Sequence, residues 1–83
     1  MQLREKTVEV DGTSFKLREL THAQLGDITK AGKENMSVPL IALSVTEPKL
    51  TEEENKNLPL RVAKKLLEAI VELNELGEIE NLK

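Results

Sequence analysis

The longest regular pattern of hydrophobic and polar positions lies in the second half of segment 47–76 and predicts an amphipathic helix. Its apolar face comprises Val62, Ala63, Leu66, Leu67, Ile70 and Leu73, and its charged face comprises Arg61, Lys64, Lys65, Glu68, Glu72 and Glu75. Leu60 and Val71 on one side, with Ala69 and Leu76 on the other, widen the apolar sector to roughly 220°, against ~100° or more for a surface helix. We therefore expect this helix to line its own core and to keep apolar surface for a partner.

Segment 6–20 has a pattern of period two around Asp11-Gly12, which predicts a β-hairpin over 3–20 with a two-residue turn and positive φ at both turn residues. In that register Val10 lies opposite Thr13 and Val8 lies opposite Phe15. Four apolar side chains then share one side of the hairpin: Val8, Val10, Phe15 and Leu17. Because an isolated two-stranded hairpin is barely stable in water, we expect that side to lie on helices or to join another sheet.

Two capping boxes predict further helix starts, one at Thr21 with Gln24 and one at Thr51 with Glu54. Pro59 fits the first turn of the long helix. Gly77 is the expected C-cap of that helix, and 77–83 is expected to form a polar tail.

Segment 35–46 is apolar nearly all round, a pattern that suits either a buried helix or a buried strand. We favour a helix, because Pro39 is tolerated in a first turn and Ala42 and Leu43 are good helix formers. Pro48 disfavours helical geometry in the residue before it, so we expect the helix to close there.

The whole chain, 1–83, is predicted to be one domain of the α+β class, mainly α. The hairpin 3–20 precedes a helical part, 21–76, with three to four helices, of which the last is the longest. With 83 residues, such a domain is near the size where one core is marginally sufficient. Help from a partner is therefore expected.

Composition argues against several kinds of site. The chain has no cysteine, Phe15 is its one aromatic residue, and its formal charge is −3, so disulfides, thiolate metal sites, stacking platforms and a basic nucleic-acid footprint are not expected. The charged start and the lack of an apolar run of ~20 residues predict neither a signal peptide nor a membrane span. We expect a soluble intracellular protein that binds neither nucleic acid nor membranes.

Candidate catalytic or metal-binding residues are few. His22 stands alone in a first helical turn, and the run 52–54 of glutamates lacks the alternating ligands and turn glycine of a calcium loop. The basic residues Arg61, Lys64 and Lys65 suit a solvated helix face better than a phosphate site. We expect no enzyme activity, no catalytic residue, no cofactor and no metal.

The candidate partner-binding residues lie on or beside the long helix: Leu60, Leu67, Val71, Asn74 and Leu76. Asn74 falls within the apolar sector, where a buried asparagine at a helix–helix seam can specify register and partner. A solvent-facing place in the last turn is an equal alternative for Asn74. For the four apolar residues, the alternative is burial in the domain's own core.

Three motifs in this order resemble the small tail assembly chaperones of long-tailed bacteriophages and prophages. They are the hairpin leading into 17–21 (LRELT), the apolar helix running into 43–54 (LSVTEPKLTEEE), and the final helix ending in 66–74 (LLEAIVELN). The resemblance covers most of the chain.

The resemblance implies a non-enzymatic protein of the host cytoplasm, absent from the mature virion, that holds the tape measure protein until tail tube subunits polymerise around it. It implies self-association and the tail tube protein as a further partner. The alternative function is a small acidic regulatory or antitoxin-like protein–protein adaptor, which would have the same acidic, helix-rich composition.

Overall fold

The computed structural model describes residues 2–30, 32 and 36–76, which form three strands and four helices in the order β1-β2-α1-α2-β3-α3-α4. The strands are β1 (Glu5–Val10), β2 (Thr13–Arg18) and β3 (Val45–Glu47), and the helices are α1 (His22–Thr29), α2 (Ser37–Ser44), α3 (Glu52–Lys56) and α4 (Leu60–Leu73). The predicted α+β class, with a hairpin first and the longest helix last, is confirmed.

The hairpin has the register that its sequence predicts. Val8 pairs with Phe15 and Val10 with Thr13, and the turn residues Asp11 and Gly12 have φ of 51° and 80°. These two positive angles are the geometry of a type I′ turn, whose twist matches that of the flanking strands. A local Asp-Gly signal therefore fixes the pairing of twelve strand residues.

A third strand was not predicted from the sequence. The helix in segment 35–46 ends at Ser44, and Val45–Glu47 pairs antiparallel with β2 to give a sheet of order β1-β2-β3. Val45 lies opposite Leu17, and the Thr46 hydroxyl donates to the Lys16 carbonyl at 3.2 Å. The free edge of β2 forms backbone hydrogen bonds with 45–47, and these bonds would be missing if the helix continued through this segment. Long-range pairing therefore overrides local helix propensity.

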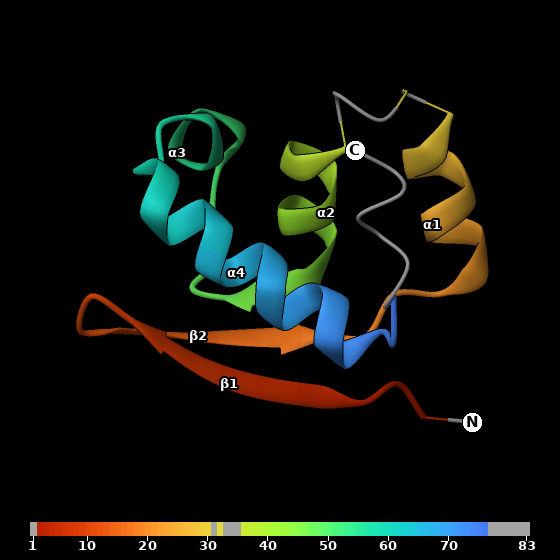
Figure 1. Ribbon diagram of the computed structural model, residues 1–83, viewed down its shortest axis with the longest axis horizontal. Coiled ribbons are helices and arrows are strands. Elements are labelled where there is room, and N and C mark those ends of the chain that lie inside the picture. Colours follow the sequence, from red (N-terminus) through yellow and green to blue (C-terminus); the bar gives the residue numbers. More distant parts are fainter. Residues whose placement is uncertain (1, 31, 33–35, 77–83) are drawn as a thin grey trace.

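The four helices lie on one side of the sheet, and no described element covers the other side (Figure 1). α4 packs against β1 and α2, and α3 packs against α2. The core between these layers is one cluster of buried apolar residues: Val10, Phe15, Leu17, Ile28, Met36, Leu40, Ile41, Val45, Val62, Leu66, Ala69, Ile70 and Leu73. The apolar side of the hairpin is thus covered by helices, as expected because an isolated hairpin is only marginally stable in water.

Both predicted capping boxes are present. The Thr21 hydroxyl accepts from the Gln24 amide while the Gln24 side chain accepts from the Thr21 amide, and Thr51 and Glu54 repeat the arrangement. Reciprocal caps of this kind satisfy two amide groups that a helix start leaves unpaired.

The end of α4 differs from the prediction. The helix stops at Leu73 rather than continuing to 76, and Glu75 takes a left-handed conformation with φ of 56°. Leu76 donates to the Val71 carbonyl at 2.8 Å and Glu75 to the Glu72 carbonyl at 3.2 Å, which is the Schellman pattern. The predicted cap at Gly77 and the polar tail 77–83 lie outside the described residues.

Ser44 provides a test of the core. Its side chain is fully buried, and its hydroxyl has no hydrogen-bond partner among the described residues. Ser44→Ala removes a polar group whose desolvation is uncompensated, so we expect it to raise the free energy of unfolding by about 1 kcal/mol. Urea denaturation measures this change. The exposed Ser37→Ala is the control, with an expected change within about 0.5 kcal/mol, and a destabilised Ser44→Ala protein would contradict the burial described.

Candidate partner-binding surface

α4 divides its apolar residues between a buried face and a partly open one. The buried face consists of Val62, Leu66, Ala69, Ile70 and Leu73. A second set, which we call the α4 stripe, consists of Leu60, Ala63, Leu67 and Val71. The spacing of three to four residues places the stripe along one side of the helix, next to the buried face.

The α4 stripe remains partly exposed after the core has formed. Leu60 is 70% exposed, and Ala63, Leu67 and Val71 are half-buried. Ala63 and Leu67 also pack against the core cluster, so these two side chains have one side in the protein and another toward solvent. Leu43 on α2 is the one other exposed large apolar residue among the described residues, and at 38% it is exposed about half as much as Leu60.

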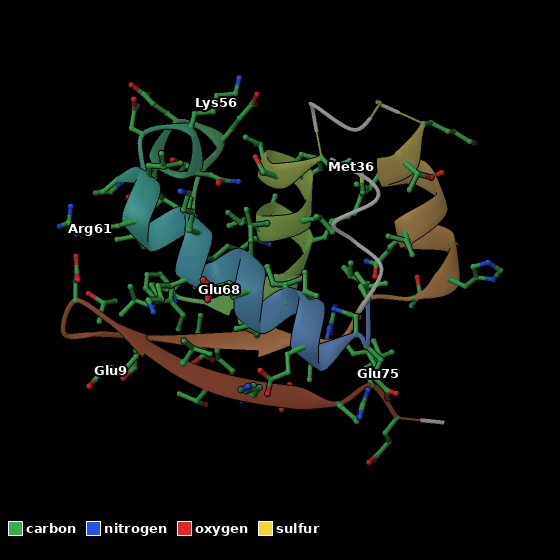
Figure 2. All side chains as sticks on the ribbon, in the orientation of Figure 1. Glu9, Met36, Lys56, Arg61, Glu68 and Glu75 are labelled. Atoms are coloured by element: carbon green, nitrogen blue, oxygen red, sulfur yellow. The ribbon has the colours of Figure 1, made fainter. Side chains whose placement is uncertain are left out.

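Ion pairs fix α4 to the hairpin along its charged side. Arg61 donates to the Asp11 carboxylate at 2.8–2.9 Å, which ties the start of α4 to the hairpin turn (Figure 2). Lys6 pairs with Glu72 at 3.0 Å near the other end. Because Arg61 is engaged in this pair, the predicted basic cluster is partly neutralised within the molecule.

The end of α4 is held by a second group of contacts, centred on Arg4. Its guanidinium donates to the Leu73 carbonyl at 2.7 Å, to Glu75 at 2.9 Å and to Glu19 at 3.2 Å, and its backbone amide donates to Glu19 at 3.0 Å. These bonds lower the pKa of Glu19, chiefly through the Arg4 amide and then through the Arg4 side chain. No local sequence signal predicts this cluster, because Arg4 and Leu73 are 69 positions apart.

Asn74 uses both ends of its amide within the chain. Its oxygen accepts from the Leu20 amide at 2.7 Å, and its nitrogen donates to the Ile70 carbonyl at 2.9 Å. Asn74 therefore joins the end of α4 to the connection between β2 and α1. Neither alternative that the sequence left open describes this arrangement, because the side chain is half-buried and bonded to its own chain.

Leu76 follows the Schellman turn and lies apart from the α4 stripe. It lines a shallow depression of about 110 Å³, and the other lining residues are Glu19, Leu20, Thr21, His22, Leu25 and Asn74. The structure thus groups Leu60, Leu67 and Val71 on one side of α4 and places Leu76 beside the start of α1.

The remaining candidates do not converge on a reaction centre. Glu52 pairs with Lys56 at 2.9 Å, and Glu54 serves the capping box, so two glutamates of the run 52–54 have local roles. No group of three potential metal ligands occurs among the described residues. A shallow depression of about 450 Å³ on the uncovered side of the sheet is lined by Thr7, Ser14, Lys16, Glu47 and Pro48.

The chain matches no protein-family model, none of the curated proteins and no solved structure. In the part of the chain that the structure describes, no helix is both long enough and apolar enough to cross a membrane.

Asn74→Ala tests the link between α4 and the β2–α1 connection. The substitution leaves the half-buried Leu20 amide without its acceptor, so we expect the free energy of unfolding to fall by about 1–2 kcal/mol. Chemical denaturation gives this value. Asn57→Ala is a matched control, because the Asn57 amide donates only to an exposed carbonyl of its own helix and a loss below about 0.5 kcal/mol is expected. Equal losses for the two variants would contradict the role given to Asn74.

Glu19 predicts a pH dependence of stability. Its pKa is lower in the folded protein than in the unfolded chain, so its contribution is present above the unfolded value of about 4.3 and is lost as the pH falls through the folded value. Glu19→Gln should therefore flatten the acid side of the profile of unfolding free energy against pH. Urea titrations at several pH values test this, and identical profiles for the two proteins would refute the assignment.

Proposed function

We propose that the protein is a non-enzymatic tail assembly chaperone of a long-tailed bacteriophage or prophage. In this proposal it works in the host cytoplasm, binds the tape measure protein, promotes assembly of the tail tube and is absent from the mature virion. The observation that carries the proposal is the α4 stripe with Leu60 70% exposed at its start. The resemblance to the family rests on the motifs in 17–21, 43–54 and 66–74. The stripe offers a physical means of holding a client.

Each of the three motifs includes the end of a strand or helix. Segment 17–21 runs from the end of β2 to the N-cap of α1, and segment 43–54 runs from the end of α2 through β3 into α3. Segment 66–74 forms the second half of α4 and its C-cap. The last motif therefore includes Leu67 and Val71 of the α4 stripe.

A long helical client presents apolar residues at the same spacing of three and four positions as the α4 stripe. Packing such a helix along the stripe removes Leu60 from water, and full burial of a leucine side chain is worth about 1.5–3 kcal/mol. One contact of this size is weak. Many copies along one client would together cover its apolar residues, and each copy leaves singly as tail tube subunits replace it.

Leu60→Glu tests the client-binding role without touching the core. We expect the variant to fold normally and to bind a tape measure fragment about tenfold more weakly, because a difference of about 1.4 kcal/mol corresponds to that factor. Coexpression with the tape measure protein, followed by copurification and measurement of the soluble client, checks the prediction.

Ala42→Glu is the matched control, because it adds the same charge at an exposed position of α2. The double variant Leu67→Glu with Val71→Glu should abolish retention where it still folds. Client retention equal to that of the unmodified protein in folded Leu60→Glu would show that the α4 stripe is not the holding surface.

A further inference from the structure

The order of the charged residues along the exposed side of α4 is unfavourable for the helix dipole. Arg61, Lys64 and Lys65 lie in the first half, and Glu68 and Glu72 lie in the second half. A helix macrodipole favours the reverse order, with acidic residues near the N-terminus and basic residues near the C-terminus. The stability of an isolated helix therefore does not account for this arrangement.

Contacts inside the molecule explain only part of the pattern. Arg61 pairs with Asp11 and Glu72 pairs with Lys6. Lys64 and Glu68 are exposed, and neither forms an ion pair with another described residue, although they are one helical turn apart. Two opposite charges beside an open apolar stripe thus have no ion-pair partner within the described part of the chain.

Lys64 lies in line with the α4 stripe. The positions Leu60, Lys64, Leu67 and Val71 are separated by four, three and four residues, which is the alternation of a coiled-coil seam, and Glu68 lies beside it. At 1.5 Å per residue this line is about 17 Å long. It has Leu67 near its centre, basic charge toward one end and acidic charge toward the other.

We propose that a second copy of this chain covers the α4 stripe, with the two α4 helices packed antiparallel about a two-fold axis between Lys64 and Leu67. In an isologous pair the same patch meets itself, so an antiparallel arrangement brings Lys64 of each copy to the partner's Glu68. A parallel arrangement instead brings Lys64 to the partner's Lys64. The charge order along α4 therefore selects the antiparallel pair.

This inference rests on the proposed function and deepens it, because the covered surface is the one that holds the client. Self-pairing and client binding then exclude each other. A free chaperone keeps Leu60, Leu67 and Val71 shielded in the pair, and a client helix of matching apolar spacing replaces the second copy. The small area of the stripe makes the pair weak and reversible, as such an exchange requires.

The pairing is tested by sedimentation of the purified full chain, without client, at several protein and salt concentrations. We expect a reversible dimer that is tighter at low salt. Lys64→Glu and Glu68→Lys should each weaken dimerisation about tenfold or more, because each places two like-charged contacts in the pair. An equimolar mixture of the two variants should restore association, since acidic positions of one chain then meet basic positions of the other.

Lys65→Glu is the control, because helical periodicity puts the exposed Lys65 outside the line of Leu60, Lys64, Leu67 and Val71, and it should leave the dimer unchanged. Circular dichroism confirms that each variant is folded. A chain that stays monomeric at low salt, or a dimer that both single variants form as tightly as the unmodified protein, overturns the proposal.

A second arm separates this inference from the proposed function. Adding a tape measure fragment to the dimer should give a complex in which the copies are no longer paired through α4. A complex that retains the α4 pair overturns mutual exclusion. A protein that dimerises as described and yet fails to retain the client counts against the chaperone function alone, and leaves the pairing intact.

Discussion

Burial of one face of α4 against the hairpin and α2 is the interaction on which the rest of the described structure depends. Five of the 13 core residues belong to this helix, so neither the hairpin nor α2 keeps its apolar side covered without it. Ion pairs of Arg61 with Asp11 and of Lys6 with Glu72 then fix its position near its two ends, and Arg4 donates to the Leu73 carbonyl at its last residue. These pairs are exposed and individually weak, so they orient a helix that hydrophobic burial holds in place.

The same helix connects stability with function. A domain of 83 residues forms only a small hydrophobic core, yet Leu60 at the start of α4 remains largely exposed to water. Leu67 and Val71 continue the line at half burial. Because Leu60 contributes little to the core, a partner can cover and uncover it without changing the packing of the fold. This property suits the proposed repeated binding and release.

Sequence reasoning succeeded where the signal is local. The Asp11-Gly12 turn determines the hairpin register, and Thr21 and Thr51 determine two helix starts, because in each case the partner lies within three residues of the signal or directly across the turn. It failed where the partner is distant. β3 exists because β2 offers an open edge some 30 positions earlier, and no pattern within 35–46 contains that information.

For the candidate surface too, local sequence signals were predictive and contacts with distant residues were not predicted. Periodicity predicted that α4 has more apolar surface than one neighbour can cover, and it named Leu60, Leu67 and Val71. It did not separate these residues from Asn74, whose amide bonds to Leu20 and Ile70, or from Leu76, which the Schellman turn carries to the start of α1. The left-handed Glu75 that produces this turn is not a residue type that favours such a conformation, so the helix end was misplaced.

The most direct test of the central claim is the solvent accessibility of leucine methyl groups, measured by NMR with a soluble paramagnetic probe at protein concentrations where the chain is monomeric. The account predicts strong broadening of the Leu60 methyl signals, no broadening of the buried Leu66 signals, and protection of Leu60 when a tape measure fragment is added. Leu60 signals as shielded as those of Leu66 in the free monomer, or equally exposed with and without the fragment, would contradict it.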